Sequence, residues 1–209
     1  TITGNNYETL NFISQGANNT VAVLNASDAT TLNVTGGTKN LTLSSFSTSL
    51  LATIDTSAFS KAFTMSASAS NKATTVTGGS GADTIITGSN NDTITTNAGN
   101  DDVTSQGGND TITTGEGADT VTNVGGDNTI TLGSGDDTLE VGTFSNLTVS
   151  DTVAGGEGTD TINFTGDAAH DFTGSSTILS NVSGFEKYKF SGLANKTVTI
   201  DSTIVNDGA

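Results

Sequence analysis

The chain has 209 residues, a net charge of −16, and no cysteine, proline or tryptophan. Only 32% of its residues are hydrophobic and 5% aromatic, which is little for the core of an ordinary globular domain of this length. Its six basic residues form no stripe that could displace counterions, so we expect no nucleic-acid partner. No run of about eighteen apolar residues occurs, so we expect no membrane span.

Residues 1–77 carry short apolar clusters at intervals of nine to eleven residues. Pairs of such clusters fit coils of about twenty to twenty-two residues, so this segment is predicted to form irregular β-solenoid coils. An antiparallel sandwich, which has similar strand spacing, is the alternative. The clusters are Leu10–Phe12, Val21–Leu24, Leu32–Val34, Leu41–Leu43, Ala52–Ile54, Phe63–Met65 and Thr74–Val76.

From residue 78 onward one acidic position recurs every nine residues. A fixed short period indicates structural units stacked on one another. Only one side chain in nine is strongly apolar, which excludes a helix. The recurring residues are Asp83, Asp92, Asp101, Asp110, Asp119, Asn128 and Asp137, and two residues after each stands Ile85, Ile94, Val103, Ile112, Val121, Ile130 or Leu139. After an interruption the unit returns around Asp160 and Ile162.

Two repeats fit one coil of eighteen residues, made of strand, turn, strand and turn. The aliphatic residues then point inward between two parallel sheets, and coils stack about 4.8 Å apart. The fourth position of each repeat needs a residue that tolerates a positive φ, because it is glycine everywhere except at Asn90. Its glycines are Gly81, Gly99, Gly108, Gly117, Gly126, Gly135 and Gly158.

This stacking places the acidic positions in two rows, one on each edge of the solenoid. Two carboxylates about 5 Å apart repel by about 1 kcal/mol in water and about 3 kcal/mol at an effective dielectric of 20. Residues 78–160 contain fourteen acidic residues and no lysine or arginine. A hard cation must therefore neutralise the rows, and Ca²⁺ suits carboxylates and carbonyls in glycine-rich loops better than Mg²⁺. Aspartates that only shape turns are the alternative, and they would leave the strict spacing unexplained.

The repeat resembles the calcium-binding nonapeptide Gly-Gly-x-Gly-x-Asp-x-U-x of RTX proteins, in which U is a large aliphatic residue. Residues 78–86 and 155–163 match it in full, and residues 115–119 and 133–137 match most of it. The resemblance implies a β-roll in which each calcium lies between turns of adjacent coils. The inner repeats are degenerate at the first two positions, and Asn128 replaces an aspartate. We therefore expect the row of Asp83, Asp101, Asp119 and Asp137 to bind calcium better than the other row.

The fold predicted is all-β, a right-handed parallel β-solenoid with a central RTX calcium β-roll. Residues 1–77 form irregular solenoid coils, residues 78–163 the roll with an interruption at 141–154, and residues 164–209 further solenoid coils or capping strands. Several calcium ions are expected at Gly79, Gly81, Asp83, Gly88, Asn90, Asp92, Gly99, Asp101, Gly108, Asp110, Gly115, Gly117, Asp119, Gly126, Asn128, Gly133, Gly135, Asp137, Gly156, Gly158 and Asp160.

Three short segments outside the repeat have predicted roles. Residues 146–149 are predicted to form a strand, followed by a longer loop through Asp151. Residues 185–190 alternate strictly and predict a strand with one buried face, and residues 198–200 predict another. A lone His170 and the lack of cysteine disfavour zinc, and no nucleophile motif occurs, so we expect no enzyme.

The mixture of irregular coils around a central RTX block resembles bacterial S-layer proteins of the RTX class, as do residues 52–59 and 182–186. This resemblance implies a secreted structural protein on the bacterial surface, exported by type I secretion, that self-associates into a lattice and could also contact surface glycan. A module of a large RTX adhesin is the second hypothesis, and an RTX appendage of a secreted enzyme the third. Because the sequence starts at Thr1 and ends at Ala209, we expect a piece of a longer protein.

Overall fold

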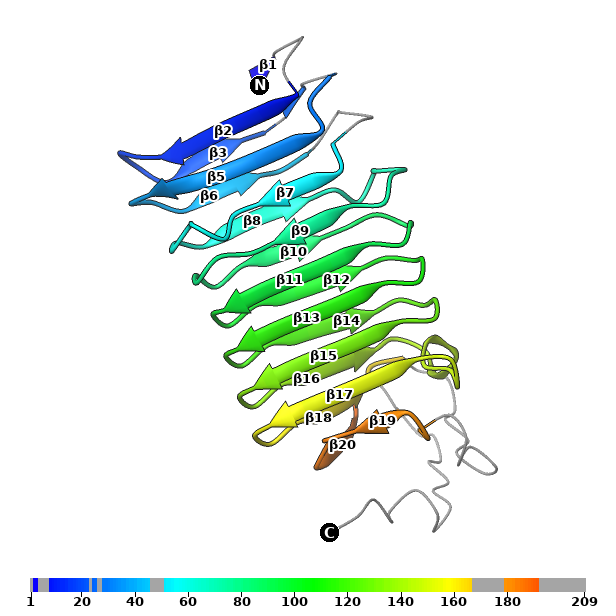
Figure 1. The fold of residues 1–209 in the computed structure, drawn as a ribbon. Coiled ribbons are helices and arrows are strands. Elements are labelled where there is room, and N and C mark those ends of the chain that lie inside the picture. Colours follow the sequence, from blue (N-terminus) through cyan, green and yellow to red (C-terminus); the bar gives the residue numbers. More distant parts are fainter. Residues whose placement is uncertain are drawn as a thin grey trace.

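The computed structural model describes residues 2–3, 8–22, 24–25, 28–45, 51–166 and 179–191. Within these residues the chain winds through two nine-stranded parallel sheets that face each other along one long stack (Figure 1). A short pair, β1 (Ile2–Thr3) and β4 (Leu24–Asn25), lies at the N-terminal end. No helix in the described residues is long and apolar enough to cross a membrane.

Successive strands alternate between the two sheets. Sheet I contains β2 (Thr9–Ser14), β5 (Thr31–Gly37), β7 (Thr53–Asp55), β9 (Thr75–Thr77), β11 (Thr93–Ala98), β13 (Thr111–Glu116), β15 (Thr129–Ser134), β17 (Thr152–Glu157) and β19 (Val182–Ser183). Sheet II contains β3 (Asn19–Val21), β6 (Leu41–Leu43), β8 (Phe63–Ser66), β10 (Thr84–Ile86), β12 (Asp102–Ser105), β14 (Thr120–Asn123), β16 (Thr138–Val141), β18 (Thr161–Phe164) and β20 (Lys187–Phe190).

The register of the sheets confirms the predicted parallel solenoid. Ile94 pairs with Ile112, which pairs with Ile130, so that one coil of the central part takes eighteen residues. The N-terminal coils are longer, since Leu32 pairs with Ile54 and Ile54 with Val76. All these pairings are parallel, so the antiparallel sandwich is wrong for the described part of residues 1–77. The domain boundaries at 77 and 163 stay predictions, because both sheets run across them.

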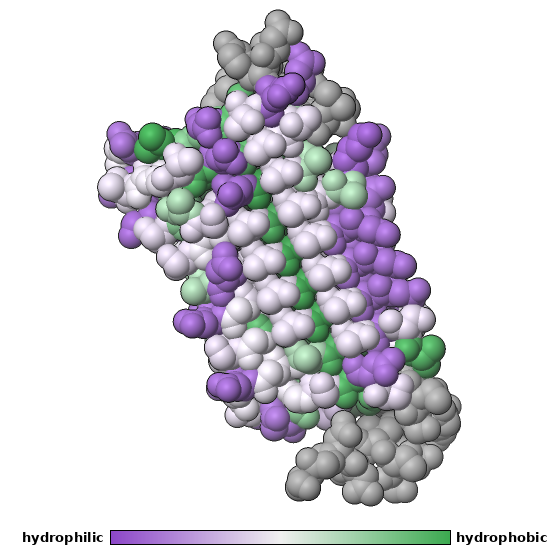
Figure 2. Space-filling model, in the orientation of Figure 1, coloured by the Kyte–Doolittle hydropathy of each residue, from purple (hydrophilic) through white to green (hydrophobic). Residues whose placement is uncertain are grey.

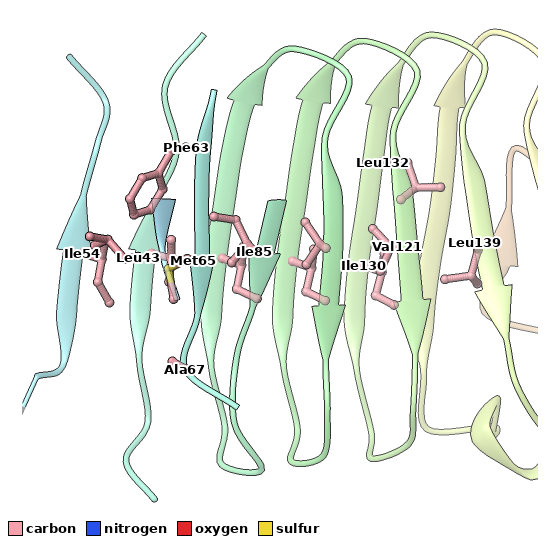
Figure 3. Packing of buried hydrophobic residues seen from close by; sticks show 14 of the residues in the cluster. Leu43, Ile54, Phe63, Met65, Ala67, Ile85, Val121, Ile130, Leu132 and Leu139 are labelled. Atoms are coloured by element: carbon pink, nitrogen blue, oxygen red, sulfur yellow. The ribbon is translucent and has the colours of Figure 1, made fainter. Parts of the chain in front are cut away.

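The core is a set of apolar columns that run between the sheets (Figure 3). Ile85, Val121, Ile130 and Leu139 are almost fully buried, as their spacing predicts. Burying one such side chain contributes about 1.5–3 kcal/mol. The second inward position is polar in strands β11 to β14, where it is occupied by Thr96, Ser105, Thr114 and Asn123, whereas β15 and β16 have Leu132 and Val141 there. Hydrophobic burial per coil is therefore small in the centre of the stack.

The interruption at 141–154 differs from the sequence prediction. Residues 146–149 are not a strand; instead, a 3₁₀ turn at Phe144–Asn146 leads to the buried Leu147, and the strand of this coil is β17. Asp137 and Asp160 are 23 residues apart instead of eighteen, so five extra residues must leave the sheet at one corner. The Asn123 and Asn146 side-chain amides each donate to the other residue's carbonyl oxygen and hold this excursion against the coil.

The C-terminal strand prediction is confirmed in part. Strand β20 starts at Lys187 and pairs with β18, while Phe185 precedes it and packs against the core. Phe190 stacks on Phe164 with ring centroids 5.2 Å apart. The predicted strand at 198–200 and His170 lie outside the described residues.

Candidate calcium-binding edges

The recurring acidic residues lie at the corners of the solenoid, where each strand begins, and they form two stacked rows. The first ladder consists of Asp83, Asp101, Asp119, Asp137 and Asp160, which precede strands of sheet II. The second ladder consists of Asp92, Asp110, Asn128 and Asp151, which precede strands of sheet I. All nine side chains are at most 2% exposed. The rows that the sequence predicts are present, and they lie inside the protein.

Each ladder is held together by the same hydrogen bond, repeated from coil to coil. The backbone N–H of Asp83 donates to Asp101 Oδ1 at 2.7 Å, and that of Asp101 donates to Asp119 Oδ1 at 2.8 Å. The first ladder continues in this way to Asp160. In the second ladder the N–H of Asp92 donates to Asp110 Oδ1 at 2.8 Å. One carboxylate oxygen per aspartate is therefore committed to the neighbouring coil.

The other carboxylate oxygen is unpartnered at most positions. The second oxygen is buried without a hydrogen-bond partner at Asp92, Asp101, Asp110, Asp119, Asp137 and Asp160. Asp83 differs, because its Oδ2 accepts the Gly79 N–H at 3.1 Å. A buried charged oxygen without a partner is costly. Its repetition at six of the nine ladder positions indicates a ligand that the protein atoms do not supply.

Burial changes the acidity of these groups. Desolvation raises the pKa of Asp83 to about 6, against the opposing N–H bonds from Phe63 and Gly79. Desolvation likewise raises the pKa of Asp137 to about 6, with repulsion from Asp119 and Asp160 adding to it. The pKa of Asp101 is raised by burial too; the nearby Thr96 hydroxyl opposes that rise, although it donates its proton to the Thr114 carbonyl oxygen at 3.0 Å and not to the carboxylate. Without a cation, the ladder carboxyl groups therefore keep their protons to a higher pH than ordinary aspartates do.

The glycines let the corners stack closely. A Cβ built on Gly117 would lie 1.7 Å from the Gly99 carbonyl oxygen, and one on Gly135 would lie 1.9 Å from that of Gly117. Both have φ near +130°, where L side chains are strained. Each glycine Cα therefore contacts a carbonyl oxygen of the preceding coil, and backbone oxygens line the corner beside the carboxylates. The other glycines with a positive φ at predicted sites are Gly99, Gly108, Gly115, Gly126, Gly133, Gly156 and Gly158.

The prediction of a positive φ at every fourth position is wrong for Gly81 and Asn90, which open the repeat array. A Cβ on Gly81 would lie 2.4 Å from the Lys61 carbonyl carbon, so this glycine is required by close approach alone. Gly79 and Gly88 likewise have no positive φ, and they contact the backbone at Phe59 and Ser70. These corners face the irregular N-terminal coils, where the regular turn has no equivalent neighbour.

The second ladder is closed near Asn128 without a cation. The Asn128 side-chain N–H groups donate to Asn123 Oδ1 at 3.2 Å and to the Gly125 carbonyl at 3.3 Å. An amide donor thus contacts the oxygens that a metal ion would otherwise bind. This geometry is consistent with the expected weaker calcium binding of the second ladder. The assignment of individual residues to calcium ions stays a prediction.

Asp151 is a ladder residue, whereas the sequence predicts a loop through it. Its Oδ1 accepts the Asn128 N–H at 2.7 Å and its Oδ2 accepts the Thr148 N–H at 2.6 Å. The signal was available: residues 151–153 read Asp-Thr-Val and stand nine residues before the Asp-Thr-Ile of 160–162. Both Asp151 oxygens accept protein N–H groups, as both Asp83 oxygens do, so neither oxygen of Asp151 is left without a partner.

The donor set fits calcium. All side-chain donors on the ladders are oxygens, and the described residues hold no cluster of three His, Cys, Asp or Glu side chains around one point. Backbone carbonyls must therefore supply much of any coordination shell. Ca²⁺ takes six to eight oxygens in flexible geometry and tolerates such a shell, whereas Mg²⁺ demands a strict octahedron.

Comparison with known proteins agrees with this site. The family model of the RTX calcium-binding nonapeptide repeat matches residues 70–103, 77–112, 96–125, 104–139, 115–147 and 150–168. These matches include both ladders, and they support an RTX-type protein whose repeats bind Ca²⁺. No curated protein and no solved structure gave a significant match to the chain.

Asp119→Ala is expected to weaken calcium-induced folding far more than Glu116→Ala. Asp119 is buried, accepts the Asp101 N–H and carries an unpartnered oxygen, whereas Glu116 is an exposed neighbour on the same turn. We expect Asp119→Ala to raise the calcium concentration at the folding midpoint about tenfold or more, since about 1.4 kcal/mol is a factor of ten. Titration with Ca²⁺ followed by circular dichroism measures both midpoints. Equal or reversed effects would show that this register is wrong.

Acidification is expected to have opposite effects with and without calcium. The pKa values of Asp83 and Asp137 are about 6 in the fold, above 3.8, so the calcium-free folded chain binds more protons than the unfolded chain between about pH 4 and 6. Its stability should therefore rise as the pH falls through this window. Protons compete with Ca²⁺ for the same oxygens, so the calcium-loaded chain should lose affinity there. Circular dichroism from pH 7 to pH 4, in calcium-depleted and in calcium-containing buffer, measures the folded fraction and tests both signs.

Asn128→Asp is expected to add a calcium ion to the second ladder. A carboxylate at 128 would face Asn123 Oδ1 and the Gly125 carbonyl, so it should destabilise the calcium-free chain and bind one more ion in calcium. Asn109→Asp adds the same charge at an exposed turn position outside the ladder and serves as the control. Isothermal titration calorimetry of both variants counts the ions. An unchanged count in Asn128→Asp would contradict this view of the second ladder.

Proposed function

We propose that the chain is a calcium-dependent structural part of a secreted bacterial cell-surface protein, most similar in role to an S-layer subunit, and that it has no enzymatic activity. The observation that carries the calcium dependence is the repeated buried carboxylate oxygen without a protein partner. Such a chain can be exported unfolded where Ca²⁺ is scarce, as type I secretion requires, and it folds outside, where sites of about 10⁻⁴–10⁻³ M affinity fill.

Self-association is supported by the outer face of sheet I. One column of this face has threonine in every described coil from β2 to β17, in register along the stack. In the parallel column Thr77, Thr95, Thr113 and Thr131 follow one another. Figure 2 shows the two columns as near-white bands on either side of a narrow green one. In the coils from β9 to β17 neither column contains a charged residue.

The outer face of sheet II is different, because Asp102, Glu140, Lys187 and Lys189 point outward there. Two copies of a chain with a charge of −16 repel each other. Calcium at the ladders removes part of this charge. The two threonine columns on the outer face of sheet I, here called the threonine face, offer a flat contact with no charge to desolvate between β9 and β17. We therefore propose the threonine face as the lateral contact of a lattice, with surface glycan as a further partner.

Calcium is expected to drive assembly of the chain into sheets or multimers, and chelation to dissolve them. Negative-stain electron microscopy and analytical ultracentrifugation, with and without millimolar Ca²⁺, measure this. Thr111→Lys, which charges the threonine face, should reduce assembly without changing the calcium midpoint of folding. Thr120→Lys places the same charge on the outer face of sheet II and should assemble like the wild type.

An adhesin module is the second candidate, because calcium stiffens such a solenoid whatever its tip binds. A chain that folds in calcium, stays monomeric at high concentration and binds an external ligand would favour the adhesin and overturn the lattice. If circular dichroism does not change between chelator and calcium, the calcium-dependent function itself is wrong.

A further inference from the structure

The first carboxylate ladder continues beyond the nonapeptide matches, which end at residue 168. The N–H of Asp160 donates to Glu186 Oε2 at 2.8 Å, as the N–H of every earlier ladder residue donates to the next carboxylate. Thr161 pairs with Lys187, so Glu186 stands directly above Asp160 in the register. Its spacing of 26 residues and its identity as glutamate hide it from the nonapeptide pattern.

Asp160 has a buried oxygen without a partner, and this oxygen lies near the coil that contains Glu186. Asp160 is fully buried, and its Oδ2 has no hydrogen-bond partner. A Cβ on Gly155 would lie 2.5 Å from this Oδ2 and 2.0 Å from the Gly184 carbonyl oxygen, so both oxygens converge on the Gly155 Cα. No described lysine forms an ion pair with either carboxylate, although Lys187 is adjacent to Glu186 in the sequence.

The same group of atoms occurs at the start of the ladder. A Cβ on Gly78 would lie 2.9 Å from Asp83 Oδ2 and 2.6 Å from the Thr96 carbonyl oxygen of the next coil. Gly184 follows Gly155 in the register, as Thr96 follows Gly78. Gly155 and Gly78 each lie next to a ladder carboxylate. The last corner thus repeats the geometry of a corner inside the matched repeats, although its sequence does not match.

We propose that Asp160, the Gly184 carbonyl and Glu186 form a further divalent-cation site that takes Ca²⁺ and fixes the last described coil to the repeat array. This site rests on the calcium function proposed above. The coil needs such a fixing point, because β19 has only two residues and Tyr188 is 39% exposed. An ion between the two coils would compensate the Asp160 and Glu186 charges and hold β20 on β18.

The test compares Glu186→Gln with Glu157→Gln in the 209-residue chain. Glu186→Gln keeps an oxygen that can accept the Asp160 N–H but loses the charge, while Glu157 is an exposed acid on the preceding coil, outside the ladder. Glu186→Gln should bind one calcium fewer by calorimetry and by elemental analysis. Amide exchange at residues 187–190 should then be at least tenfold faster in calcium, with residues 101–137 unchanged. Glu157→Gln should match the wild type in both.

An unchanged calcium count in Glu186→Gln overturns the site, even if amide exchange accelerates, because Glu186 would then only receive a hydrogen bond. An anomalous-difference map of calcium-loaded wild-type crystals decides without any variant. A peak between Asp160 and Glu186 supports the site, and peaks at the other coils with none here refute it. A wild-type chain that binds no Ca²⁺ at all overturns both this site and the calcium function, whereas failure to form a lattice leaves the site standing.

Discussion

The structure depends on one constraint: a carboxylate is buried at the corner of nearly every coil, with one oxygen accepting an N–H of the preceding coil and the other, at most corners, without a protein partner. Burying a charge in this way is costly unless it is paired. The chain offers no basic residue between 78 and 160 to pair with it, so the cost can only be offset from outside. The glycine corners follow from the same constraint, because they bring backbone oxygens of neighbouring coils close to the carboxylates.

The sequence predicts the centre of this molecule well because period and structure coincide there. A nine-residue repeat without a shift determines which residues stack. The stacking of Asp83 on Asp101 follows from counting two repeats along the sequence. Counting fails where the coil length changes. Asp151 was missed because five extra residues precede it, and Glu186 because both its spacing and its side chain differ from the repeat. Burial was not predictable either, since a turn aspartate is ordinarily exposed, and only the stack shows that the rows lie inside.

The solenoid keeps its buried carboxylates at the corners, apart from the uncharged outer face of sheet I between β9 and β17. Its corners hold the ladder carboxylates, while the threonine face of sheet I between β9 and β17 presents hydroxyl and methyl groups only. Threonine suits this position because a β-branched side chain packs well on a pleated surface. A cation bound at the corners therefore changes the net charge and the stiffness of the stack without altering the chemistry of the flat face. Under the proposed lattice contact, folding and association respond to one ion through different surfaces.

The residues at or just before the start of each sheet II strand form one column along the stack, and this column stabilises the coils in two different ways. Leu41 pairs with Phe63, and Phe63 stands at the register position that Asp83 takes in the next coil. The column thus runs from Asn19 through the apolar Leu41 and Phe63, and it is carboxylate from Asp83 to Glu186 in the described coils. In strands β11 to β14 the second inward position is polar as well, as at Thr96 and Ser105. Both changes remove hydrophobic burial from the same coils, so these coils must draw on cation binding for what the N-terminal coils obtain from Leu41, Phe63 and Met65.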